Sequence, residues 1–390
     1  MLGGVEQVMA AHAVALRDAG AAVTIVAARG SAPHGTRMVR IPAVSSKHPA
    51  VLRDLAELAR GHVTAGHARL VADLVRVLRP IVRTADRVVV HNVLTMHLSL
   101  ALTEALAALA QERRGTFIAW THDIAWVDPR YASERHPGDP WDIVARAIPN
   151  VRYVTVSEER AAQLSALTGL ARGRITVVPN GIDLRLRLAL SSAGIALAER
   201  LGLFDADPLL LLPARLTRRK RIEVAIDAVG ALRKRHPSAA LVITGSPGPH
   251  NPANLRYADE LAVRARRTGG AHLLHTLRGR VSDRVMADLF ALADALVLPS
   301  ESEGFGIPVL EAGAHGLPVI CSDLPVLRET CGDAATYVDP RADGRAIAAA
   351  VEARLASDPV ARLRRTAKAH AWPRILRERV VPVILSGDAR

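Results

Sequence analysis

The chain is short of cysteine and of aromatic residues, and it has no long uninterrupted apolar run. Two of its 390 residues are cysteines, and Phe, Trp and Tyr together make up 3%. Two cysteines exclude a disulfide-stapled scaffold and a zinc module built on cysteine. Few aromatics argue against a platform for stacking single-stranded nucleic acid. No apolar stretch reaches the ~18 residues that a membrane span requires, because the longest candidate is interrupted by Thr103 and Glu104.

The start of the sequence, MLGGVEQVMA, does not resemble a secretory signal. Such a signal has a basic segment followed by an apolar one. We therefore expect a reducing, cytoplasmic setting.

The chain is basic, with 51 Lys and Arg against 38 Asp and Glu and a net charge of +13. A basic excess suits nucleic acid, a membrane surface or a phosphorylated substrate. Here the excess is spread over both halves of the chain without a basic tail. This distribution favours a small anionic substrate, and no nucleic-acid partner is expected. A compositional bias toward Arg is the alternative explanation.

Short apolar runs alternate with segments of helical periodicity along the whole chain. Strands separated by helices are typical of βαβ units and a mostly parallel sheet, and the number of strands suits two doubly wound domains better than one. The expected strands are 22–27, 87–91, 116–120, 153–156, 175–178, 209–213, 241–244, 295–298 and 318–321. The clearest helical segments are 5–19, 52–81, 221–235 and 254–267.

The domain division is predicted after the segment VVPNGID, residues 177–183, where an apolar strand ends in a Pro-Asn-Gly turn. Ligands of parallel sheets bind at the carboxyl ends of the strands, so we expect one cleft between the domains. Gly3 and Gly4 precede a helix, as in the turn that closes a first βα unit. The strand that should come before them is missing from the sequence, so we expect an incomplete first sheet or another element in its place.

The most informative segment is PSESEGFGIPVLE, which follows an apolar strand. Gly304 and Gly306 allow a ligand to approach the backbone closely. Pro308 opens a helix, where its missing N–H costs nothing, and the N–H groups of the first turn attract phosphate. Glu303 precedes this helix, and Glu311 is expected on its first turn. Carboxylates suit a hydroxyl-rich ligand because their oxygens accept hydrogen bonds.

The spacing of Glu303 and Glu311, in the form EGFGIPVLE, resembles the signature of the retaining glycosyltransferases of family 4. GGVE near the start resembles the glycine loop of this family, VVPNGID its interdomain connection, and Arg215 with Lys220 its phosphate-gripping pair. The resemblance implies the α/β GT-B fold: two Rossmann-like doubly wound domains facing across a cleft, here with the first N-terminal strand missing. It implies an acceptor domain at 1–182, joined by a C-terminal helix at 371–390, and a donor domain at 183–370.

The resemblance also assigns roles to donor-binding residues. Arg215 and Lys220 would hold the diphosphate, Glu311 the ribose hydroxyls, and Glu303 the donor sugar as a catalytic residue. Arg and Lys after a strand suit the negative charge of a leaving nucleoside diphosphate, so neither a metal ion nor another cofactor is expected. A solvated basic helix start, RRKR, is the alternative for this segment. The remaining donor-binding residues are Gly3, Gly4, Gly304, Phe305 and Gly306.

Polar residues also follow two expected strands of the first domain. His122 matches the family histidine that touches the transferred sugar, and it is predicted to be catalytic. Asp123 would orient His122 or bind an acceptor hydroxyl. His91 and Asn92 are further candidates for acceptor or donor contact. Trp126 lies in a loop rich in aromatics that would pack on an acceptor sugar, or that would form a small core of its own.

The helical stretch 50–83 carries arginines beside apolar residues. Packing of the apolar residues against the first sheet is the favoured interpretation. Peripheral contact with an anionic membrane is the alternative.

These observations predict a retaining transferase that moves a hexose from UDP-glucose or GDP-mannose to an acceptor hydroxyl. The acceptor would contain sugar, phosphate or lipid. One alternative is a sugar-nucleotide 2-epimerase of the same architecture. Another is a non-catalytic protein that binds a nucleotide sugar.

Overall fold

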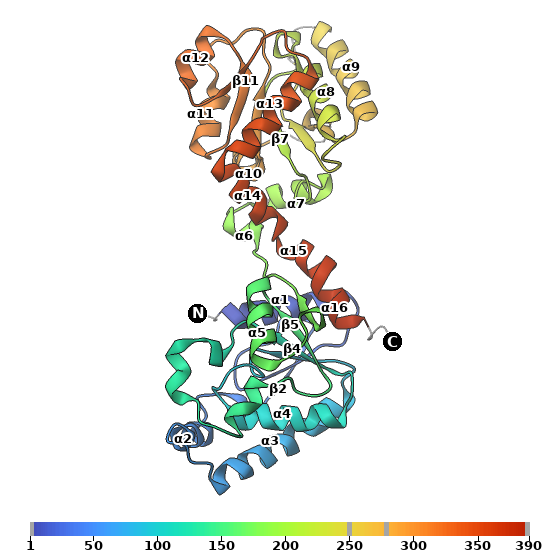
Figure 1. Cartoon of the computed structure of the whole chain (residues 1–390). Coiled ribbons are helices and arrows are strands. Elements are labelled where there is room, and N and C mark those ends of the chain that lie inside the picture. Colours follow the sequence, from blue (N-terminus) through green and yellow to red (C-terminus); the bar gives the residue numbers. More distant parts are fainter. Residues whose placement is uncertain (1–3, 248–251, 277–280, 387–390) are drawn as a thin grey trace. The chain divides into compact units, whose positions relative to one another are not determined.

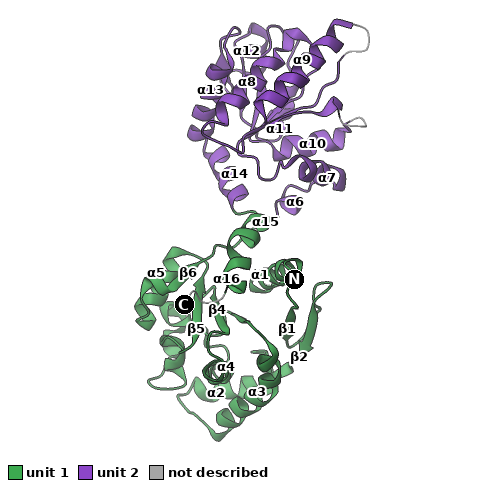
Figure 2. Ribbon diagram, turned by 90° about the vertical axis from the view of Figure 1, so that its right-hand side faces the viewer, with its two compact units in different colours: residues 1–181, 370–390 green, residues 182–369 purple. Residues whose placement is uncertain are grey.

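The computed structural model describes residues 4–247, 252–276 and 281–386 (Figure 1). The chain forms two compact units (Figure 2). Unit 1 comprises Met1–Gly181 and His370–Arg390, and unit 2 comprises Ile182–Ala369. The expected boundaries, after residues 182 and 370, each lie one residue from the boundaries of these units.

Unit 2 is built on a six-stranded parallel sheet with the order β12-β11-β10-β7-β8-β9. The chain moves from β7 outward to β9 in one direction, and from β10 outward to β12 in the other. The strand order therefore reverses between β7 and β10, and such a switch point is where open α/β sheets bind ligands. The strands are β7 (Leu209–Leu212), β8 (Ala240–Ile243), β9 (Ala271–Leu273), β10 (Ala295–Leu298), β11 (Val319–Ser322) and β12 (Thr336–Val338).

Alternate residues of these strands face opposite layers of helices. Leu210 and Leu212 of β7 lie in one apolar cluster with residues of α8, α9 and α13, whereas Leu209 and Leu211 lie in another with residues of α7, α10, α11 and α12. This alternation is the period-two pattern of a strand buried on both faces. The helices of unit 2 are α6 (Leu184–Arg187), α7 (Ser192–Leu201), α8 (Ile222–Leu232), α9 (Pro252–Thr268), α10 (Asp283–Leu292), α11 (Ile307–Ala314), α12 (Pro325–Cys331), α13 (Gly344–Ser357) and α14 (Pro359–Ala369).

The strands of unit 1 form two separate parallel sheets, β1-β2 and β3-β4-β5-β6. Among the described residues, β1 pairs only with β2 and β3 only with β4, so the sheet is divided where a central first strand would lie. Three of the four β3 residues are only partly buried, whereas all five of β4 are buried. The expectation of an incomplete first sheet is confirmed. The strands are β1 (Thr24–Ala27), β2 (Arg37–Arg40), β3 (Val88–His91), β4 (Phe117–Thr121), β5 (Val151–Thr155) and β6 (Ile175–Val177).

Two helical layers cover the four-stranded sheet. Phe117 and Ala119 of β4 lie in the cluster formed with α2, α3 and α4, and Ile118 and Trp120 lie in the cluster formed with α1 and the C-terminal segment (Figure 1). That segment contributes buried residues from α15, a π-helical turn and α16 to unit 1. The helices are α1 (Gly4–Asp18), α2 (Pro49–Leu58), α3 (Ala65–Thr84), α4 (Leu100–Glu112), α5 (Glu158–Thr168), α15 (Trp372–Ile375) and α16 (Val381–Leu385).

The predicted strands are all present, with each end within two residues of its expected position. Strands β2, β9 and β12 were not predicted, because each is short and none is fully buried. The prediction of one helix over 52–81 is wrong, since α2 and α3 are separate helices. Gly61, with a φ of +79°, lies between them, and this left-handed conformation does not continue an α-helix.

Most large apolar residues of α2 and α3 pack in the core, whereas Leu52 is exposed. Leu58, Leu74 and Leu78 are buried in the unit 1 core, as the favoured interpretation predicts. No helix in the described part of the chain combines the length and the apolar character needed to cross a bilayer.

A buried histidine links α2, α3 and α4. Nδ1 of His67 lies 2.9 Å from Oδ2 of Asp54, and its Nε2 lies 3.3 Å from Oε2 of Glu104. Burial disfavours the charged imidazole, but the hydrogen bonds and charges of the two carboxylates outweigh burial and raise the pKa of His67 to about 9. The protonated ring therefore joins three helices through one charge.

This network predicts a pH-dependent stability. Because its pKa rises from 6.5 to about 9 on folding, His67 stabilises the protein fully below pH 6.5, and this contribution is lost as the pH rises through 9. The difference in unfolding free energy between the wild type and H67Q should shrink by about 3 kcal/mol over that interval, at about 1.4 kcal/mol per pKa unit. Urea unfolding at several pH values measures it.

The exposed His62 in the same segment provides the control, and H62Q should show no such change. An H67Q protein whose stability depends on pH as the wild type does would contradict the assignment.

Candidate functional site

The loops that follow β7 and β10 meet at the carboxyl edge of the unit 2 sheet. The backbone N–H of Glu301 donates to the carbonyl of Arg219 at 2.7 Å, and Nη1 of Arg219 donates to the carbonyl of Ser302 at 2.9 Å. Since β7 and β10 are neighbours at the switch point, these bonds join the two loops where a ligand of this fold is expected.

Lys220 and Glu303 form an ion pair between these loops. Nζ of Lys220 lies 2.5 and 2.6 Å from the two carboxylate oxygens, and the side chains are 12% and 6% exposed. The hydroxyl of Ser300 also donates to Oε1 of Glu303 at 2.6 Å. The residue predicted to hold phosphate and the residue predicted to contact the sugar therefore bind each other.

The glycine-rich turn presents open backbone next to this pair. Gly306 has a φ of +89°, and a Cβ there would lie 2.6 Å from Cδ2 of Leu327, so only glycine fits. A Cβ on Gly304 would meet nothing within 4 Å. The Phe305 side chain is 54% exposed. Pro308 lies in the first turn of α11, as expected, and the helix begins directly after the glycine-rich turn, at Ile307.

Arg215 and Glu311 lie on the same edge but apart from the ion pair. Both side chains are exposed, and no contact described for the chain joins either of them to Lys220 or Glu303. Glu311 was expected on the first turn of α11, but the helix begins at Ile307, which places Glu311 on the second turn. A bound ligand would have to bridge these groups.

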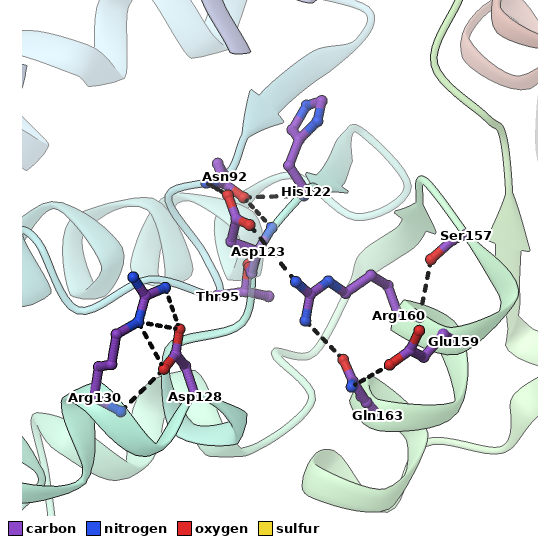
Figure 3. Close-up of polar contacts among 10 residues, drawn as sticks. All are labelled: Asn92, Thr95, His122, Asp123, Asp128, Arg130, Ser157, Glu159, Arg160 and Gln163. Atoms are coloured by element: carbon purple, nitrogen blue, oxygen red, sulfur yellow. Dashed lines mark hydrogen bonds and ion pairs between the residues drawn. The ribbon is translucent and has the colours of Figure 1, made fainter. Parts of the chain in front are cut away.

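In unit 1, the candidate residues lie where β3 and β4 end. His91 is the last residue of β3. Asn92 follows it, and His122 and Asp123 follow the end of β4 (Figure 3). Arg160 approaches from the first turn of α5, where Ser157 caps the helix by accepting a hydrogen bond from the Arg160 backbone. The structure therefore brings these four predicted residues together.

Asn92 makes three hydrogen bonds within this group. Its Oδ1 accepts from the backbone N–H of His122 at 2.9 Å and from that of Asp123 at 2.7 Å. Its Nδ2 donates to Oδ2 of Asp123 at 3.1 Å. Thr95 donates to the Asp123 carbonyl at 2.8 Å, and Nη2 of Arg160 lies 3.8 Å from Oδ1 of Asp123 (Figure 3).

The histidines of this group are held in the neutral form. Nδ1 of His91 lies 3.5 Å from Nε2 of His122. Burial, followed by the charge of His122, lowers the pKa of His91 to about 3. Burial also lowers the pKa of His122, although Asp123 opposes this change. His122 therefore offers a neutral imidazole near pH 7, which can both donate and accept a hydrogen bond.

Two other candidates lie outside the two groups. The ring of Trp126 stacks on His97 with centroids 5.3 Å apart, and its Nε1 donates to the Trp141 carbonyl at 2.9 Å, so it takes part in the local packing of its loop. Gly4 is the first residue of α1 and is exposed. Gly3 lies outside the described residues.

Several residues of these sites were not predicted from the sequence. Ser300 and Arg219 tie the unit 2 loops together, and Arg160 and Thr95 contact Asp123. Ser300 and Arg219 lie in the two segments that were singled out, the glycine-rich segment and RRKR, whereas Arg160 and Thr95 carried no signal. No group of three or more His, Cys, Asp and Glu side chains in the described ranges is placed to hold a metal ion.

The fold and sites define a two-domain α/β protein with polar loops at the carboxyl edge of each main sheet. A family model described as Glycosyltransferase Family 4 matches residues 2–186, and one described as Glycosyl transferases group 1 matches residues 196–371. The chain belongs to the family 4 glycosyltransferases, as its motifs predicted.

Curated relatives agree with this membership. A D-inositol 3-phosphate glycosyltransferase of Nocardia farcinica is 34% identical over 47% of this chain and 40% of its own length. A glycogen synthase of Mycobacterium tuberculosis is 32% identical over 64% of this chain and 58% of its own length. These alignments thus span about half the length of the relatives.

Solved structures align over nearly the whole chain. One is WaaG, a glycosyltransferase involved in lipopolysaccharide biosynthesis, with 17% identity, 99% of this chain and 97% of that chain covered, and a TM-score of 0.37. Another is Anabaena HepE in complex with UDP and glucose, with 17% identity, 98% and 94% covered, and a TM-score of 0.37. Because these TM-scores are low, the assignment of the fold rests instead on the observed strand order and on the family match.

The largely covered ion pair predicts a stability effect at one site residue. K220M would leave the Glu303 carboxylate without its cation, which should lower the unfolding free energy by about 3 kcal/mol, the lower end of the cost of breaking a buried pair. K220M/E303Q should recover most of the loss because it removes the uncompensated charge. Denaturant unfolding of the two variants and the wild type measures both effects.

The neighbouring pair of Arg218 and Glu260 supplies a control, because its side chains are 67% and 56% exposed. E260Q should cost less than about 1 kcal/mol. An equal cost for K220M and E260Q would show that the pair of Lys220 and Glu303 does not support the fold.

Proposed function

We propose that this protein is a retaining glycosyltransferase that moves a hexose from a nucleotide sugar, UDP-glucose or GDP-mannose, to an acceptor hydroxyl. The contact between Lys220 and Glu303 at the unit 2 switch point carries the proposal. This contact joins a cation, which would suit a diphosphate, to a carboxylate, which would suit sugar hydroxyls, and so supports the proposal. Family membership and the exposed backbone of the glycine turn support it.

Donor binding would exchange the partners of this pair. The diphosphate is a stronger and multiply charged acceptor for Lys220, and the dipole of α11, whose N-terminus follows the glycine turn, would add to its attraction. Glu303 would then be released to accept hydrogen bonds from the hexose. Arg215, exposed on the same loop as Lys220, would join the phosphate, and Glu311 would accept from the ribose.

The chemistry would follow from charge stabilisation at the leaving group. As the bond between the anomeric carbon and the phosphate oxygen breaks, negative charge develops on the nucleoside diphosphate, and Lys220 and Arg215 would stabilise it without a metal ion. The acceptor hydroxyl would attack from the face that the leaving group vacates and pass its proton to the departing phosphate. This mechanism is inferred from the family resemblance.

The acceptor would bind in unit 1, near His122 and Asp123. The neutral imidazole and the carboxylate can both bind hydroxyl groups. The relatives' names offer an inositol phosphate and a glucan as trial acceptors, and the basic excess of the chain favours the phosphorylated one. A 2-epimerase would instead isomerise its donor without an acceptor, and a non-catalytic protein would bind the nucleotide without turnover.

Nucleotide affinity and turnover should respond differently at Lys220 and Glu303. K220A should weaken UDP or GDP binding about tenfold or more, because it removes a charged hydrogen bond worth about 1.5–3 kcal/mol. E303Q should strengthen binding, because it removes a carboxylate that competes for Lys220, yet lower turnover by about 100-fold or more. Calorimetric titration and release of labelled hexose from UDP-glucose and GDP-mannose measure the two effects.

E260Q again serves as the matched control and should change neither quantity. If UDP, GDP and ADP all fail to bind the wild type, the donor site is wrong. If a nucleotide binds but D-inositol 3-phosphate and glycogen receive no hexose, and the donor is isomerised or left intact, one of the two alternatives holds.

A further inference from the structure

The turn that carries His122 and Asp123 is held from the neighbouring strand by one side chain. Asn92 has a φ of 62°, a left-handed backbone conformation that Asn tolerates better than most residues. This conformation places the amide across the end of β4. Both backbone N–H groups that reach its Oδ1, those of His122 and Asp123, can only donate, which fixes the orientation of the amide. Its NH₂ group must then face the Asp123 carboxylate, as it does.

We propose that Asn92 is the positioning residue of the unit 1 site, which sets the places of the His122 ring and the Asp123 carboxylate for the reaction. The proposal rests on the proposed transferase function. We assign Asn92 a positioning role rather than a direct contact with substrate, because both polar atoms of its amide already form hydrogen bonds within the protein. The backbone N–H of Asn92 also donates to the Trp120 carbonyl at 2.9 Å, so its position is tied to β4 on both sides.

The same contacts leave the Asp123 carboxylate accessible to a ligand. Asp123 receives one hydrogen bond from Asn92 and has Arg160 at 3.8 Å, while its side chain remains 56% exposed. It is therefore oriented from one side and open on the other. In Figure 3 the His122 ring points away from Asn92 and Asp123, so the two functional groups lie on different sides of the turn that Asn92 fixes.

N92G isolates the amide, because glycine adopts the left-handed backbone without strain. N150G is the matched control: Asn150 has a φ of 63° and is exposed, but it precedes β5 at the opposite edge of the sheet. N92G should lower kcat about 100-fold, the cost of a misplaced catalytic group. The affinity for UDP or GDP should stay within about twofold, because the nucleotide is assigned to unit 2 and neither ligand carries the hexose that His122 would touch. N150G should match the wild type.

Amide hydrogen exchange tests the positioning without any turnover. In N92G, a peptide covering residues 117–125 should exchange at least about tenfold faster at the His122 and Asp123 amides. N92D keeps the acceptor oxygen and should keep these amides protected, yet it places a second carboxylate against Asp123 and should lower kcat. Adding D123N to N92D restores a donor opposite the carboxylate, and these amides should stay protected in the double variant as well.

The outcomes of these experiments distinguish the proposed transferase function from the positioning role of Asn92. A wild type that transfers no hexose from either donor overturns the proposed function, and the exchange data alone then decide whether Asn92 fixes the turn. Fast exchange in N92G with unchanged kcat overturns the positioning role in catalysis. Wild-type exchange in N92G overturns the proposal altogether.

Discussion

The partly buried ion pair of Lys220 and Glu303 is the interaction on which the unit 2 site depends. Two strands far apart in the sequence, β7 and β10, are neighbours because the sheet reverses its order between them. That pairing brings their loops together, and the ion pair and the Arg219 contacts hold them there. A charge pair that is largely removed from water adds little net stability, but it is costly to break by removing one partner. The two loops are therefore held together in the structure without a ligand.

In unit 1 the loops of the site are held together by hydrogen bonds of one side chain rather than by a buried ion pair. This unit has no buried ion pair at its site, among the residues that the structure describes, and instead a single amide bridges two strand ends. The sheet of this unit is divided between β1 and β3, yet β4 and β5 are well buried and α1 packs with the C-terminal segment on one face. The part of the sheet that carries His122 and Asp123 thus has a complete core beneath it.

Much of the fold and part of the site could be predicted from the sequence. Buried strands such as β10 are continuous apolar runs, so the sequence shows where they begin and end. Strands β9 and β12 are short and only partly buried, so they show no distinct apolar run. The Glu303–Glu311 segment stood out because glycine, proline and acid residues are each restricted in where they fit. The contact of Glu303 with Lys220, and the left-handed Asn92 facing Asp123, depend on strand order and backbone geometry, which no local pattern encodes.

The central claim is that Lys220 leaves Glu303 to bind the diphosphate of a nucleotide sugar. A crystal structure of the protein with UDP or GDP tests it most directly. The account predicts a phosphate oxygen about 2.7–2.9 Å from Nζ of Lys220, the length of a charge-assisted hydrogen bond, with Glu303 turned toward the space for the hexose. A nucleotide bound elsewhere, or a diphosphate in place with Lys220 still on Glu303, would contradict it.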